Sequence, residues 1–144
     1  MSPFRRFRRL SSDERQLLVS AVALVTAVRI GVLMCGFRRL RRALAWLGRR
    51  RATVPLPPER IEWAVRAAAR RVPGGSTCLV QALAAETLLV RHGHVAEFRI
   101  GIARAGEGVE AHAWLERNGH PVFGNPGPAH VVLPPLPPLD PHLG

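Results

Sequence analysis

The chain has 144 residues, enough to bury one hydrophobic core, and 47% of them are hydrophobic, which excludes an intrinsically disordered chain. Its formal net charge is +11, and residues 1–51 carry all of it, with 13 arginines against Asp13 and Glu14. This basic half lacks aromatic interleaving, zinc-ligand spacing and a helix-turn-helix pattern, so we expect no nucleic acid among the partners. A protein, an acidic peptide or an anionic membrane surface fits the charge better.

Residues 13–47 are predicted to be helical. Ser11 or Ser12 is the expected N-cap, and acidic residues follow in the first turn, where the helix dipole favours them. Residues 17–28 carry no charge, but this apolar run is shorter than the roughly 20 residues that a membrane span needs. We therefore expect the run to pack against the domain or a partner. A membrane-spanning helix that continues to residue 36 stays the alternative.

The second part of this region is predicted to form a basic amphipathic helix. Apolar side chains recur at helical spacing and arginines occupy the other faces; the apolar positions are Phe37, Leu40, Leu44 and Leu47. Such a helix suits a membrane surface or an acidic groove. The proline-rich residues 52–58 then form a linker, so we expect residues 1–51 to be a helical N-terminal region, separate from a core at 59–133 and a proline-rich tail at 134–144.

The core is predicted to start with helices and to end with strands. One helix covers 59–71, and a second covers 78–92 with Ser76 or Thr77 as its N-cap and Gly93 at its end. Alternating patterns then predict strands at 95–104, 109–117 and 120–124, and a short strand at 131–133 is the one element considered near the tail. Asn118-Gly119 is a strong hairpin signal. This order predicts an α+β fold, with helices followed by a small antiparallel sheet.

The cysteine at the start of helix 78–92 is the first candidate for chemistry. A thiol attacks as the thiolate, and a helix N-terminus stabilises a thiolate. Gly75 precedes it and lets a substrate backbone come close, so we predict that Gly75 contacts substrate. A small buried hydrophobic residue is the alternative interpretation of Cys78. Two cysteines, Cys35 and Cys78, are too few for a disulfide scaffold, so we expect a cytoplasmic protein, with membrane association as the alternative.

A cysteine nucleophile needs a base, and His112 is the best candidate. It lies in the middle of the predicted strand 109–117, whereas the other histidines occupy helix ends, turns or the tail. Asn125 and Glu116 are the candidates for the group that orients His112, and Asn125 is favoured because an adjacent strand can bring it beside the imidazole. Trp114 shares the His112 face, and it is predicted either to pack in the core or to form a wall of the substrate cleft and bind substrate.

These residues carry a family resemblance. The order of cysteine, histidine and asparagine on helix, strand and strand resembles papain-like and transglutaminase-like cysteine enzymes. Residues 76–126, with "CLVQALAAETLLVRHG" followed by "AHAWLE", resemble the split-form leader peptidase of lasso peptide biosynthesis, the B protein. The third member of its triad is commonly aspartate, whereas this chain has Asn125.

The resemblance implies a papain-like or transglutaminase-like core and a specific task. The enzyme would use Cys78, His112 and Asn125 and a thioester acyl-enzyme to remove the leader from a ribosomally made lasso precursor peptide. The split form implies a separate leader-recognition protein as a partner, and an ATP-dependent lasso cyclase that acts on the freed core peptide. It implies no cofactor and no metal.

Three other readings stay open. The apolar helix and the positive charge fit a non-enzymatic, membrane-associated assembly factor with a degenerate protease fold. A thioester intermediate also allows transglutaminase-like acyl transfer to an amine. A metal site built from Cys78, His92, His94 and His112 is the third reading, although a His-Gly-His run at a helix end is poor ligand geometry and no carboxylate cluster supports it.

Overall fold

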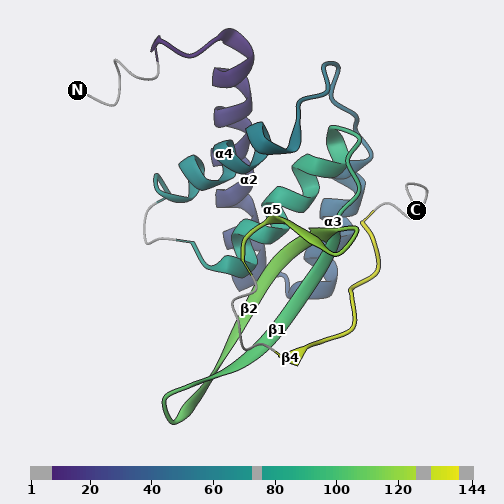
Figure 1. The fold of residues 1–144 in the computed structure, drawn as a ribbon. Helices are drawn as coiled ribbons and strands as arrows, with labels where there is room; N and C mark the ends of the chain where they lie inside the picture. Colours follow the sequence, from purple (N-terminus) through teal and green to yellow (C-terminus); the bar gives the residue numbers. More distant parts are fainter. Residues whose placement is uncertain (1–7, 73–75, 126–130, 140–144) are drawn as a thin grey trace.

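Helices come first and strands last, which confirms the predicted α+β fold class (Figure 1). The computed structural model describes residues 8–72, 76–125 and 131–139. The helices are α2 (Ser12–Met34), α3 (Phe37–Gly48), α4 (Pro58–Ala69) and α5 (Cys78–Arg91). The strands are β1 (Glu97–Ala105), β2 (Gly108–Arg117), β3 (His120–Phe123) and β4 (Val131–Val132).

The helical region predicted over 13–47 is two helices, with a break between them that the sequence did not predict. α2 begins at a capping box: Ser11 Oγ accepts from the Glu14 amide at 3.2 Å, and the Glu14 carboxylate accepts from the Ser11 amide at 3.0 Å. The break comes at Gly36, whose φ of 74° is a left-handed conformation that suits glycine. Gly31 then lets α3 approach, because a Cβ there would lie 2.6 Å from Leu40 Cδ1.

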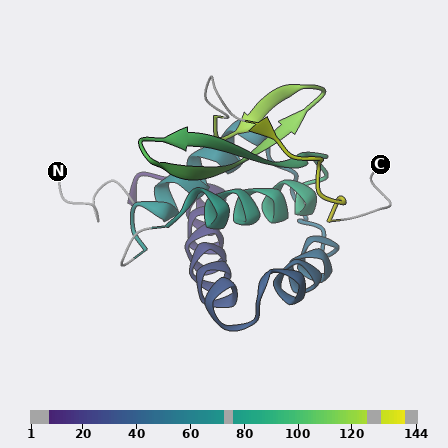
Figure 2. The same cartoon turned by 90° about the horizontal axis from the view of Figure 1, so that it is seen from below.

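α5 is the central helix of the molecule. Every residue from Ala82 to Val90 is buried, because α2, α3, α4 and the sheet all pack on the helix. Figure 2 shows the sheet on one side of α5 and α2 and α3 on the other. Buried residues of α2 and α3, among them Val25 and Leu44, belong to the same apolar core as those of α4 and α5. The predicted linker at 52–58 thus lies between helices that share one core.

The sheet is antiparallel, with the strand order β3-β2-β1-β4. The observed strands agree with the predicted ones within two residues at each end. Asn118 (φ 52°) and Gly119 (φ 78°) make the predicted turn between β2 and β3. β4 does not lie beside β3 but pairs with the opposite edge, where Gly101 faces Val132.

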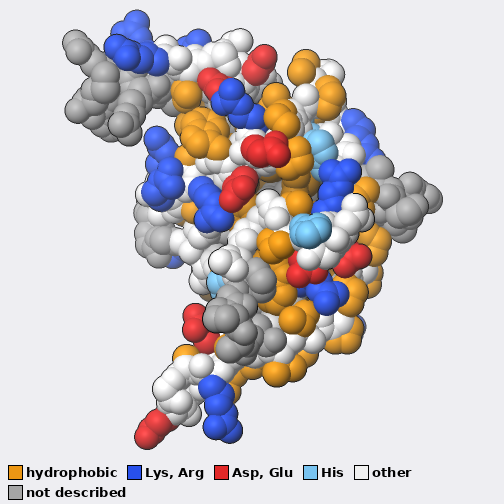
Figure 3. Space-filling model, in the orientation of Figure 1, with side chains coloured by type: hydrophobic (Ala, Val, Ile, Leu, Met, Phe, Trp, Pro, Cys, Tyr) orange, Lys and Arg blue, Asp and Glu red, His pale blue; other side chains and the backbone are white. Residues whose placement is uncertain are grey.

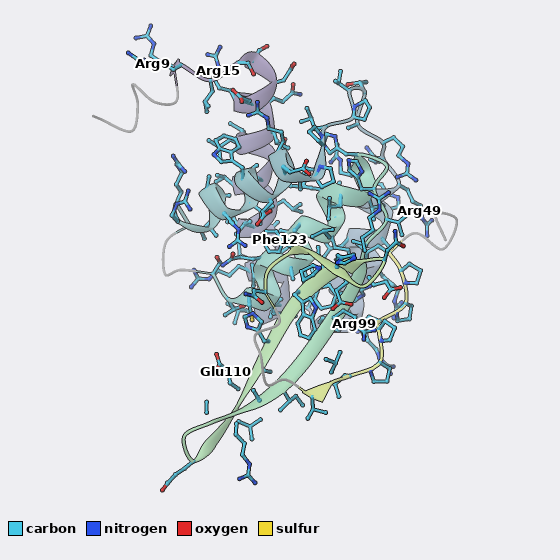
Figure 4. The ribbon with its side chains drawn as sticks, in the orientation of Figure 1. Arg9, Arg15, Arg49, Arg99, Glu110 and Phe123 are labelled. Carbon is cyan, nitrogen blue, oxygen red and sulfur yellow. The ribbon has the colours of Figure 1, made fainter. Side chains whose placement is uncertain are left out.

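The two faces of the sheet have different surroundings. Phe98, Leu115 and Phe123 are buried in the apolar core with α5. Side chains alternate along a strand, so His112, Trp114 and Glu116 share the opposite face of β2. Beyond these residues the β1–β2 hairpin extends as an arm away from the helices, with Glu110 far along it (Figures 1 and 4).

Candidate functional site

Cys78 is the first residue of α5, as predicted. Thr77 is the N-cap, and its side chain accepts a hydrogen bond from the Val80 amide at 3.3 Å. The loop before the helix is held by Gln81, whose side-chain amide donates to the Ser76 carbonyl at 3.2 Å. The remaining first-turn amides and the helix dipole give this end of α5 a partial positive charge.

The fold brings this sulfur to the middle of β2. Cys78 Sγ lies 3.9 Å from the carbonyl oxygen of Ala111, 33 residues later in the chain. That carbonyl is bonded to the backbone nitrogen of His112, so covalent geometry places the sulfur within about 6 Å of the His112 backbone. Cys78 is partly buried and packs against the apolar core. The candidate nucleophile and the segment that carries the candidate base are therefore neighbours.

The His112 face of β2 forms an ordered row of side chains. The His112 and Trp114 rings are stacked, with centroids 6.5 Å apart and an interplanar angle of 29°. Trp114 is 0% exposed, and its indole N–H donates to Glu116 Oε1 at 2.8 Å. The other Glu116 oxygen lies 3.7 Å from Arg99 Nε, on the neighbouring strand (Figure 4). Both oxygens of Glu116 thus contact other groups, and this carboxylate fixes Trp114 beside His112.

Asn125 lies two residues beyond the end of β3. The last registered pair of β2 and β3 is Leu115 with Phe123, and the strands run in opposite directions. Gly124 follows with a φ of 75°, and a Cβ on it would lie 3.1 Å from Trp114 Cβ. The chain therefore passes Trp114 and continues in the direction of His112 as it reaches Asn125, whose side chain is exposed.

Gly75, the predicted substrate contact, lies outside the described residues. His130 and His142, two of the six histidines, lie outside them as well.

The histidines of the alternative metal site hold the linker instead. His92 Nδ1 accepts from the Leu56 amide at 3.1 Å, and His94 Nε2 lies 2.6 Å from the Leu56 carbonyl oxygen. Burial is the main cause that lowers the pKa of His92, which favours this neutral, accepting ring. Over residues 8–72, 76–125 and 131–139, no group of three or more His, Cys, Asp or Glu side chains is placed to hold a metal ion.

A buried ion pair beneath the sheet was not predicted. Arg41 Nη1 lies 2.9 Å from Glu86 Oε2, and Glu86 is 1% exposed. Burial raises the pKa of Glu86 to about 7, and the Arg41 charge only partly offsets this effect. Arg41 also donates to the Pro137 carbonyl at 2.6 Å and lies over the Phe98 ring. Arg41 therefore connects α3, α5, the sheet and the C-terminal segment.

One feature of the sequence pointed to this ion pair. Glu86 stands alone in an otherwise apolar stretch of helix, and a lone acid there needs a cation. Its partner could not be chosen from the 13 arginines of residues 1–51 without the fold.

One family model matches most of the chain. The family model described as the transglutaminase-like superfamily matches residues 18–133, which include Cys78, His112 and Asn125. The match begins inside α2 and ends just after β4, so it covers the helices as well as the sheet. No curated protein and no solved structure is similar enough to the chain to count as a match.

Proposed function

The chain belongs to the transglutaminase-like superfamily, and from this premise we propose that it is a cysteine peptidase that removes the leader from a ribosomally made lasso precursor peptide. One observation carries the enzymatic part of the proposal: Cys78 Sγ lies 3.9 Å from the carbonyl that precedes His112. The lasso assignment rests on the resemblance of residues 76–126, and the partners follow from it: a leader-recognition protein and an ATP-dependent cyclase.

The proposed reaction has two steps. His112 takes the thiol proton of Cys78, and the sulfur attacks the carbonyl carbon of the last leader residue. The C–N bond breaks, His112 gives its proton to the leaving amine of the core peptide, and the leader remains as a thioester on Cys78. Water, deprotonated by His112, then attacks the thioester and releases the leader as a carboxylic acid. Asn125 would accept from the other ring N–H of His112 and so hold its orientation.

The outer edge of β2 supports an extended peptide as substrate. The Leu133 and Leu136 amides donate to the carbonyls of Ile100 and Phe98, so these β1 residues direct their backbone groups away from β2. When a residue of an antiparallel pair directs its backbone groups outward, the residue that faces it also directs its own outward. Ala113 faces Ile100, and Ala111 faces Ile102. The backbone N–H and C=O groups of both alanines therefore point away from β1.

The outer edge of β2 reaches the Cys78 sulfur. Among the described residues β3 pairs with β2 only from Leu115 onward, and the Ala111 carbonyl already faces Cys78. An extended peptide that adds to this edge would bring one of its carbonyls to Cys78 Sγ.

The test is cleavage of the precursor in the presence of the recognition protein, followed by mass spectrometry. We expect two fragments whose masses sum to that of the precursor plus one water. Cys78→Ala should abolish cleavage, and Cys35→Ala is the matched control, because Cys35 is exposed at the end of α2. If leader were transferred to an added amine faster than to water, the acyltransferase alternative would replace the peptidase.

A further inference from the structure

An exposed apolar corner lies on the side of the molecule opposite to the sheet. α2 and α3 meet there, and their connection is the part of the chain farthest from the sheet (Figure 2). At this α2–α3 corner, which we define as residues 30–42, Leu33 is 79% exposed and Met34 is 78% exposed. Ile30 is exposed on the preceding turn of α2. Large apolar side chains in this setting commonly mark an interaction surface.

The charge around the corner has one sign. Arg38, Arg39 and Arg42 are exposed on the first turns of α3. No acidic residue occurs between Glu14 and Glu59, so α2 and α3 carry no acid after the first turn of α2. In contrast, acidic and basic side chains are interspersed on the face of the molecule shown in Figure 3. The corner therefore complements an anionic partner.

An exposed aromatic residue lies on the same side of α3 as these arginines. Trp46 follows Arg39 and Arg42 at helical spacing and is 55% exposed. The Arg50 guanidinium lies over its ring, 4.1 Å from the centroid. Tryptophan and arginine together are typical of protein surfaces that rest in the headgroup region of a bilayer.

The packing of α2 argues against a membrane span. α2 is long and apolar enough to cross a bilayer, but a third of its most apolar window is buried in the protein. Its buried side chains pack against α4 and α5, and they are Leu17, Leu18, Ala21, Leu24, Val25 and Val28. A spanning α2 would have to leave this core. Its most exposed large apolar side chains, Leu33 and Met34, lie on the last turn, although Val19 near the start of the helix is also exposed.

From these observations we infer that the α2–α3 corner docks the protein on an anionic lipid bilayer. Ile30, Leu33 and Met34 enter the headgroup boundary, and the arginines of α3 contact lipid phosphates. The sheet lies on the other side of α5, and Cys78 contacts β2 of that sheet, so Cys78 remains in the aqueous phase. This inference does not depend on the proposed reaction.

Vesicle sedimentation with the full chain tests the docking. The probes are phosphatidylcholine vesicles with and without phosphatidylglycerol, and we expect binding only to the anionic vesicles, with loss at high salt. Replacing Arg38, Arg39 and Arg42 with glutamine should weaken binding by roughly fivefold for each arginine. The double variant Leu33→Ser and Met34→Ser should weaken it by about tenfold or more. Val109→Ser with Arg104→Gln, on the exposed hairpin arm, is the matched control and should bind as the wild type does.

Four outcomes would overturn the inference. One is an absence of vesicle binding together with binding to polyglutamate, which would indicate an acidic protein partner. Another is equal binding to neutral and anionic vesicles. A third is unchanged binding by the Leu33 and Met34 variant when its unfolding midpoint equals that of the wild type. The last is retention on vesicles through an alkaline, high-salt wash, which would show that α2 spans the bilayer.

Discussion

At the scale of single residues, the site depends on two contacts, one between distant parts of the chain and one within β2. One joins Cys78 to the backbone just before His112, and the other joins the Trp114 indole to Glu116. The first could be expected from the sequence, because a cysteine on a helix N-terminus and a histidine within a strand are unusual positions. The second could not, because the sequence offered Glu116 as a partner of His112. The choice depends on side-chain directions that only the fold defines.

Trp114 should support both the fold and the reaction. Trp114→Ala removes a fully buried ring, so the free energy of unfolding should fall by about 3–5 kcal/mol. Trp114→Phe keeps a ring beside His112 and loses mainly the hydrogen bond to Glu116, so its loss of stability should be nearer 1 kcal/mol. Chemical denaturation measures both values. If kcat of the folded Trp114→Ala protein were unchanged, Trp114 would have only a packing role.

Glu86 should make stability depend on pH. Its pKa in the folded chain is raised from the ordinary value of 4.5 to about 7, so between these values the folded chain binds more protons than the unfolded chain. The contribution of Glu86 to the free energy of unfolding must then decrease as the pH rises through this window. Glu86→Gln removes the titration, so the stability of the wild type relative to this variant should fall from pH 4.5 to pH 7. A constant difference across the window would show that Glu86 does not titrate there.

At the scale of the elements, local signals predicted most boundaries. Helix caps and hairpin turns act within a few residues: the sequence narrowed the N-caps to Ser11 or Ser12 and to Ser76 or Thr77, and it identified the Asn118-Gly119 turn. The break at Gly36 was missed, because the residues on both sides favour a helix and only the packing of α3 on α2 requires the turn. The sequence also could not predict where β4 lies in the sheet, because its pairing with β1 joins distant parts of the chain.

The arginines of α3 should separate into two classes. Arg41→Gln leaves the Glu86 carboxyl buried without its cation and removes the bond to the Pro137 carbonyl, so stability should fall by about 3 kcal/mol. Arg38→Gln, on the exposed face of the same helix, should change stability by less than about 0.5 kcal/mol. Thermal or chemical unfolding distinguishes them. Equal effects would mean that the pair with Glu86 does not contribute to the fold.

At the scale of the whole molecule, the boundary between the basic and neutral halves of the chain does not divide the hydrophobic core. The sequence separates a basic half from a neutral half at residues 52–58, and this prompted the prediction of a separate N-terminal region. The apolar core runs across that boundary, because the buried faces of α2 and α3 pack on α4 and α5. The superfamily match also starts before it, at residue 18. The distribution of charge along the chain therefore does not show how the helices pack.

A chain that begins at residue 52 should therefore fail to fold. It would expose the faces of α4 and α5 that α2 and α3 cover, and these faces are almost entirely apolar. Circular dichroism during heating should show no cooperative transition for this shorter chain. A cooperative transition near the midpoint of the full chain would show that residues 52–144 are an independent domain.

The central claim is that the Cys78 sulfur carries the leader as a thioester. The most direct measurement is the intact mass of the Cys35→Ala protein after rapid acid quenching of its reaction with precursor and recognition protein. We predict an added mass equal to the leader acyl group, located on Cys78, lost on treatment with hydroxylamine and absent from Cys78→Ala. Cleavage by Cys78→Ala at the wild-type rate, or an adduct on any other residue, would contradict the account.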